Sequence, residues 1–164
     1  MCESRKQNRL QNHDYSQPGY YFITICTESK KKYFGEICDG KMVLNEYGKT
    51  IKQQWEWLKS QYSYIDLDVF VIMPNHIHGI IIIKNYNNVG TGRDLSLQKI
   101  KSISELIGAF KTTSSKLIHK VGCTEFSWQR SFYDHVVRQD ESLDKIREYI
   151  VNNPLKWELD EYRL

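Results

Sequence analysis

Apolar residues recur along the chain with two periods, and the changes of period separate predicted strands from predicted helices. Alternating β-branched and aromatic residues are typical of half-buried strands, whereas apolar residues three or four positions apart are typical of helices. These patterns predict strands over 19–27, 65–73 and 76–84, a β-hairpin within 30–45, a strand or broken hairpin within 126–138, and helices over about 46–61, 102–118 and 140–153.

Turn and capping residues mark where these elements begin and end. Asp39-Gly40 is typical of a two-residue hairpin turn, and Pro74-Asn75 predicts a tight reversal that makes the flanking strands antiparallel neighbours. The helix signals are a capping box formed by Ser102 and Glu105, a cap at Asp140 and a closing Pro154. The polar, glycine-containing stretch 85–99 is expected to be a surface loop.

In chain order, helices are interspersed among mainly antiparallel strands. This order predicts an α+β fold, and the ferredoxin-like βαββαβ arrangement, an antiparallel sheet with helices covering one face, fits it best. At 164 residues the chain supports one core and is too short for two comfortable domains. We therefore expect a single domain over 1–164, with its core at about 18–157 and terminal extensions at 1–17 and 158–164.

The composition is ordinary for a globular protein, with 40% hydrophobic and 26% charged residues. No run reaches the ~20 apolar residues of a membrane span, and the polar N-terminus lacks the apolar core of a secretion signal, so we expect a cytoplasmic protein. The four cysteines are too scattered for a disulfide framework or a zinc–thiolate site. A net charge of +3 permits a polyanionic partner without requiring one.

Two histidines interrupt the apolar strand pattern "VFVIMPNHIHGIIII". Because side chains alternate along a strand, His76 and His78 project to the same face, with Cβ atoms ~6.5–7 Å apart, and can share one divalent metal ion. The alternative is a pair of hydrogen-bonded core histidines. Since each unsatisfied buried polar group costs ~1–3 kcal/mol, a shared partner is favoured. Gly79 follows them and is expected to let a ligand approach the backbone.

Two familiar histidine sites are excluded by the surrounding residues. A histidine-triad nucleotide hydrolase needs a third histidine at the next alternate position, which is Ile80. A catalytic zinc site needs a third ligand and a general base, and the chain has no H-E-x-x-H motif.

The last predicted helix offers one further ligand and one nucleophile. Tyr149 lies at the edge of its apolar stripe, and Asn153 follows one turn later on the same side. A phenol with a pKa of about 10 is a weak nucleophile at neutral pH, but a metal ion that polarises a phosphodiester offsets this. The alternative is that Tyr149 is a packing residue.

Three segments resemble one family of enzymes. "PNHIHGIII" resembles the HUH motif of the IS200/IS605-type (Y1) single-strand transposases. "SWQRSFYDHVVRQDESLDKIREYIVNNPLKW" and "GAFKTTSSKLIHK" are similar to segments of their REP-associated tyrosine transposase relatives, in which a Y-I-x-x-N-P segment carries the catalytic tyrosine. The resemblance runs over about 18–157.

This resemblance implies a nuclease and strand transferase that cleaves and rejoins single-stranded DNA at hairpin-flanked sites. By position, His76, His78 and Asn153 would bind Mg²⁺ or Mn²⁺, and Tyr149 would form a 5′-phosphotyrosine intermediate. Classical insertion-sequence members have Gln at the last ligand position, and Asn here is similar to the REP-associated branch. No ATP site is needed, and no P-loop is present.

Three basic residues, Lys111, Arg130 and Arg138, are candidate phosphate contacts. His135 matches the family pattern, but its alternating strand favours a structural hydrogen bond. A domesticated protein that binds DNA hairpins without cutting is the main alternative function, and a metal-dependent phosphohydrolase would need an activated water. The resemblance leaves both a homodimer and a monomer open.

Overall fold

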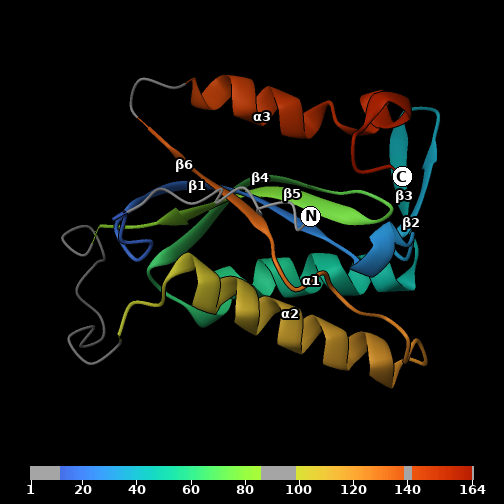
Figure 1. Cartoon of the computed structure of the whole chain (residues 1–164), viewed down its shortest axis with the longest axis horizontal. Coiled ribbons are helices and arrows are strands. Elements are labelled where there is room, and N and C mark those ends of the chain that lie inside the picture. The colour runs from blue at the N-terminus through green and yellow to red at the C-terminus, as the bar shows by residue number, and fades with distance from the viewer. Residues whose placement is uncertain (1–11, 86–98, 139–141, 164) are drawn as a thin grey trace, which may run out of the picture.

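A four-stranded antiparallel sheet forms the centre of the protein (Figure 1). The structure, a computed structural model, describes residues 12–85, 99–138 and 142–163. Across the sheet the strands are β4 (Ile65–Ile72), β5 (His76–Ile83), β1 (Gly19–Cys26) and β6 (Tyr133–Val137). With α1 (Glu46–Gln61) after β1 and α2 (Ile103–Lys120) after β5, the order is βαββαβ, which confirms the predicted ferredoxin-like α+β fold.

Helices α1 and α2 cover one face of the sheet, as predicted. Asn45 caps α1 by accepting a hydrogen bond from the Gly48 amide, and the helix buries Ile51, Trp55 and Leu58. The predicted capping box of Ser102 and Glu105 opens α2. The inward side chains of both helices meet the odd-numbered residues of β1 and β5 in the main core, which includes Tyr21, Ile23, Ile25, Ile77 and Ile81.

Helix α3 (Leu143–Val151) lies on the opposite face, so the prediction that the helices cover one face holds for α1 and α2 only (Figure 1). The physical reason is visible in β5, which is buried on both faces. A strand with two apolar faces needs a covering layer on each side. Helix α3 supplies this second layer, above the even-numbered residues of β5.

A separate hairpin, β2 (Gly35–Cys38) and β3 (Lys41–Leu44), lies at one end of the sheet. Its turn residues Asp39 and Gly40 have φ of 49° and 71°. Two successive positive φ angles are the geometry of the two-residue hairpin turn that the sequence predicts. Short 3₁₀ helices, η1 (Glu28–Lys30) and η4 (Pro154–Leu159), complete the described elements.

Two predicted boundaries are wrong, and the alternatives left open within 126–138 are decided for a strand. The N-cap of α3 is Ser142, whose side chain accepts from the Lys145 amide; the expected cap, Asp140, lies outside the described residues. Pro154 opens η4 instead of closing α3, because proline fits the first turn of a helix, where no amide hydrogen is needed. Within 126–138, β6 alone is a strand, preceded by a single bridge between Trp128 and Thr27.

Most of the expected loop 85–99 and of the extension 1–17 lies outside the described residues. Among the described cysteines, Cys26, Cys38 and Cys123 carry free thiols. In the described part of the chain, no helix combines the length and apolar character needed to cross a membrane.

Candidate active site

His76 and His78 lie side by side on the face of β5 that α3 covers. Both are buried, and their Nε2 atoms are 3.1 Å apart. Ile77 between them packs into the opposite core. The alternation of the strand thus brings the two imidazoles together, as the sequence predicts.

Asn75 fixes the tautomer of His76. The Asn75 amide nitrogen donates to the carbonyl oxygens of Lys30 and Tyr162, at 3.0 and 2.7 Å. Its oxygen therefore faces the imidazole and accepts from His76 Nδ1 at 2.8 Å. With the proton on Nδ1, the Nε2 atom of His76 presents a lone pair to the site.

His78 is held in the same way from the neighbouring strand. Thr24 lies opposite His78 in the register of β1 and β5, and its Oγ1 is 2.8 Å from His78 Nδ1. A hydroxyl can donate or accept, so it serves either tautomer of this ring. Burial lowers the pKa of His76 to about 2 and that of His78 to about 3, so both rings are neutral at pH 7, the form that binds metals.

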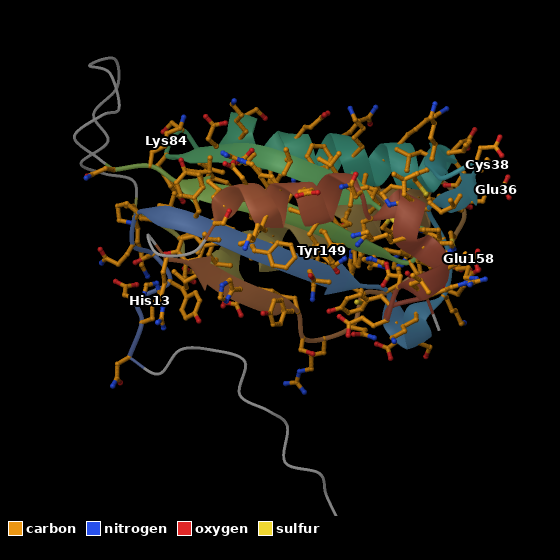
Figure 2. All side chains as sticks on the ribbon, turned by 90° about the horizontal axis from the view of Figure 1, so that it is seen from above. His13, Glu36, Cys38, Lys84, Tyr149 and Glu158 are labelled. Carbon is orange, nitrogen blue, oxygen red and sulfur yellow. The ribbon has the colours of Figure 1, made fainter. Side chains whose placement is uncertain are left out.

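Tyr149 reaches this pair from α3. Its hydroxyl is 3.4 Å from His78 Nε2, and its ring packs edge-on against Phe22 of β1. Figure 2 shows the ring projecting from the helix over the sheet. Burial, with the nearby charges of Asp160 and Glu161, raises the pKa of Tyr149, while the Asn153 side chain lowers it.

Asn153 follows α3 at the start of η4 and is 4% exposed. Its Oδ1 atom is buried without a hydrogen-bond partner. Its side chain interacts with that of Tyr149, which in turn faces His78. An orphaned amide oxygen in this position fits a site for a cation.

The sequence prediction missed Asp160. Its side chain is 3% exposed, and Oδ2 lies 3.5 Å from His76 Nε2. His76, His78 and Asp160 each offer a donor atom within 4.8 Å of the others. Asp160 falls in the stretch 158–164, which was expected to be a terminal extension. The signal that could have found it is the pair of aromatic residues around it, Trp157 and Tyr162, whose rings lie against His76.

The donor set suits a hard or borderline divalent ion. Imidazole nitrogen with amide and carboxylate oxygen is tolerable to Mg²⁺ and better for Mn²⁺. The orphaned oxygens of Asn153 and Asp160 and the lone pair of His76 all fit the ion that the sequence implies.

Gly79 does not open the site to a ligand, and this expectation is wrong. One residue after His78, it belongs to the opposite face of β5, where an added Cβ would lie 2.6 Å from Cζ2 of Trp55. Gly79 therefore makes room in the core for the indole ring of Trp55, which α1 carries.

The candidate phosphate contacts lie on different parts of the molecule. The ammonium of Lys111 donates to the carbonyl oxygens of Gln129, Arg130 and Ser131, so it holds the loop before β6. Arg130 lies in that loop and Arg138 directly follows β6, and both are exposed. His135 lies on β6 opposite Phe22, on the same sheet face as the histidine pair.

Two proteins of Haemophilus influenzae are similar in sequence, and no protein-family model matches the chain. One, described as uncharacterized, is 38% identical over 165 residues, which span 96% of this chain and 92% of that protein. The other, provisionally named a REP-associated tyrosine transposase, is 25% identical over 154 residues, which span 87% of this chain and 74% of that protein.

Two solved structures are similar in fold. A REP-associated tyrosine transposase bound to a REP hairpin matches 90% of this chain and 73% of its own, with a TM-score of 0.57 and 18% identity. A Deinococcus radiodurans protein, provisionally named a transposase, matches 88% of this chain and 97% of its own, with a TM-score of 0.50 and 14% identity. At these identities the likeness shows a shared fold.

Proposed function

Since the chain belongs to the same family as the uncharacterized Haemophilus influenzae protein and shares the fold of a REP-associated tyrosine transposase, we propose that it is a Y1-type single-strand DNA transposase. In this proposal a single domain over 1–164 cleaves and rejoins DNA at hairpin-flanked sites. The named similarities, to one protein called a REP-associated tyrosine transposase and to another bound to a REP hairpin, support the class and the partner.

One observation carries the proposal: the Tyr149 hydroxyl lies 3.4 Å from a buried, neutral histidine pair. Tyrosine and histidines come from elements about 70 residues apart, α3 and β5. A tyrosine that only packs against the sheet does not need to direct its hydroxyl at an imidazole nitrogen. A nucleophile that must approach a metal-bound phosphate does.

The reaction is a transesterification. The Tyr149 oxygen forms a bond to the scissile phosphorus while the bond from phosphorus to the 3′ oxygen breaks, which leaves a 5′-phosphotyrosine and a 3′-hydroxyl. The phenol gives up a proton and the 3′ oxygen gains one, so the step is balanced. His76, His78 and Asn153 would hold Mg²⁺ or Mn²⁺, which when bound neutralises charge that develops on the phosphate.

The raised pKa of Tyr149 sets a requirement on this chemistry. A phenol that holds its proton at neutral pH is a poor nucleophile by itself, so attack is proposed to require a metal ion held by the neutral histidine pair. Arg130 and Arg138, exposed beside β6, are proposed to bind the DNA backbone, and Lys111 is proposed to act with them by positioning the Arg130 loop.

The test is a labelled single-stranded hairpin oligonucleotide, incubated with the protein and Mn²⁺ or Mg²⁺. We expect a covalent protein–DNA adduct that resists denaturation and is lost in Tyr149→Phe. Tyr20→Phe is the matched control, because Tyr20 is exposed to a similar degree, 37% against 40%, and lacks the histidine contact. Cleavage that persists in Tyr149→Phe contradicts the assigned nucleophile.

The second candidate function is hairpin binding without cleavage. It is favoured by the solved structure of similar fold that is bound to a REP hairpin. Tight hairpin binding by the wild type, with no adduct in either metal, would decide for this alternative.

A further inference from the structure

We propose that Asp160 is a metal ligand of this site, carried to the histidines by the segment 160–163. The inference rests on the proposed function, which supplies the metal ion. It adds to that function a carboxylate ligand from outside α3 and β5. Asn153 then supplies an additional oxygen instead of being the sole third ligand.

The segment 160–163 is fixed over the histidine pair by several contacts. The Tyr162 ring centroid is 5.0 Å from that of His76 and 5.5 Å from that of His78. Asn75 donates to the Tyr162 carbonyl oxygen at 2.7 Å, and Lys30 Nζ donates to the Glu161 carbonyl oxygen at 2.9 Å. The segment is therefore built into the site.

The two oxygens of Asp160 have different surroundings. Oδ1 accepts a hydrogen bond from the Tyr162 amide at 2.7 Å, which closes a local turn and orients the carboxyl group. Oδ2 is buried, has no hydrogen-bond partner and lies 3.5 Å from His76 Nε2. Burying an unpaired carboxylate oxygen is expensive, so such an atom calls for a positive partner.

His76 cannot be that partner. Asn75 holds the imidazole proton on Nδ1, so the atom that faces Asp160 Oδ2 is a nitrogen lone pair. Two electron-rich atoms face each other here, and the Nε2 atom of His78 lies 3.1 Å from that of His76. A divalent cation among them turns this repulsion into coordination by one carboxylate and two imidazoles.

A consequence is that metal binding and docking of the segment are linked. A metal ion bound to Asp160 and to the histidines of β5 ties the segment to the sheet, and the docked carboxylate raises metal affinity in the absence of DNA. Asn75 contacts both partners, since it orients His76 and holds the Tyr162 carbonyl.

The experiment is a Mn²⁺ titration of the full chain without DNA, followed by the electron paramagnetic resonance signal of free Mn²⁺. We expect Asp160→Asn to weaken Mn²⁺ binding by at least ~10-fold, as loss of a ligand or its support does. Glu161→Gln is the matched control, because it removes the same charge from the adjacent, exposed residue and no ligand atom. Circular dichroism checks folding, and Asp160→Ser is the second variant should Asp160→Asn not fold.

The outcomes separate this inference from the proposed function. Asp160→Asn and Asp160→Ser that bind Mn²⁺ as the wild type does, while His78→Ala does not bind it, overturn the ligand role of Asp160 and leave the histidine site standing. Equal weakening in Glu161→Gln also overturns it, because charge alone then explains the effect. Binding of Mn²⁺ that depends on Asp160, in a protein that never forms a DNA adduct, supports the ligand and contradicts the transposase.

Discussion

Arg147 of α3 donates two hydrogen bonds to one carboxylate oxygen of Asp68 on β4. Nε and a terminal nitrogen lie 2.9 and 2.6 Å from Oδ2. The other Asp68 oxygen accepts from the Val69 amide, which orients the carboxylate. Because Tyr149 is two residues from Arg147 on the same short helix, this ion pair fixes the helix that carries the proposed nucleophile.

Arg147→Ala is expected to slow adduct formation more than it destabilises the protein. A displacement of the nucleophile by ~1 Å can lower the rate by up to ~100-fold, whereas a partly exposed ion pair adds little to the free energy of unfolding. The measurement compares single-turnover adduct formation with the melting temperature. Lys145→Ala, which removes an exposed positive charge from the same helix, is the control. Equal rates in the two variants would contradict the positioning role.

Gly79→Ala is expected to destabilise the protein by ~1–3 kcal/mol through overpacking of the core. Its Cβ would lie 2.6 Å from Trp55 and 3.0 Å from Phe70, and Trp55 is fully buried. Gly108→Ala is the control, since nothing lies within 4 Å of its Cβ in α2 and alanine favours helix by up to ~1 kcal/mol. Urea denaturation measures both. A folded Gly79→Ala variant with the stability of the wild type would contradict the overpacking.

Local periodicity predicted much of the site, and chain connections determined the rest. The two-residue period of β5 placed His76 and His78 together, and the helical period put Tyr149 at the edge of its apolar stripe. The same alternation assigns Gly79 to the other face, where it packs against Trp55. Asp160 and the face on which α3 lies depend on how the chain turns after Val137 and Val151, which no local period encodes.

Without metal, the protein is expected to lose stability as the pH falls below ~6.5. His76 and His78 have their pKa lowered to about 2 and about 3, whereas in the unfolded chain they bind protons near 6.5. The unfolded state therefore binds more protons in this window, which lowers the free energy of unfolding by up to ~1.4 kcal/mol per pH unit for each histidine. The raised pKa of Asp160 acts in the opposite direction and reduces the slope.

Urea denaturation in EDTA between pH 7.5 and 5 measures this slope, in a range where carboxylates of ordinary pKa contribute little. A double variant, His76→Gln with His78→Gln, is expected to flatten it. His119→Gln, which removes a histidine at the end of α2 whose Nε2 atom is 2.7 Å from the Phe126 carbonyl oxygen, is the control for the loss of a histidine away from the pair. A slope that survives in the double variant means that other groups carry the pH dependence.

Lys111 is expected to stabilise the fold, whereas Arg130 is expected to contact DNA. Burial lowers the pKa of Lys111 to about 8, so at pH 7 the group keeps its proton and donates to three carbonyl oxygens. Lys111→Met keeps the apolar stem and leaves these carbonyls without their donor, which is expected to lower the free energy of unfolding by ~1–3 kcal/mol. Because those carbonyls belong to the loop that carries Arg130, DNA affinity falls as a secondary effect.

Arg130→Met is expected to show the opposite pattern. An exposed arginine that contacts one phosphate contributes about one unit to the slope of the logarithm of DNA affinity against the logarithm of salt concentration. Its loss should lower that slope by ~1 and leave the urea midpoint unchanged. Hairpin binding at several salt concentrations, beside urea denaturation, measures both variants. A stability loss in Arg130→Met, or a wild-type urea midpoint in Lys111→Met, would reverse the two roles.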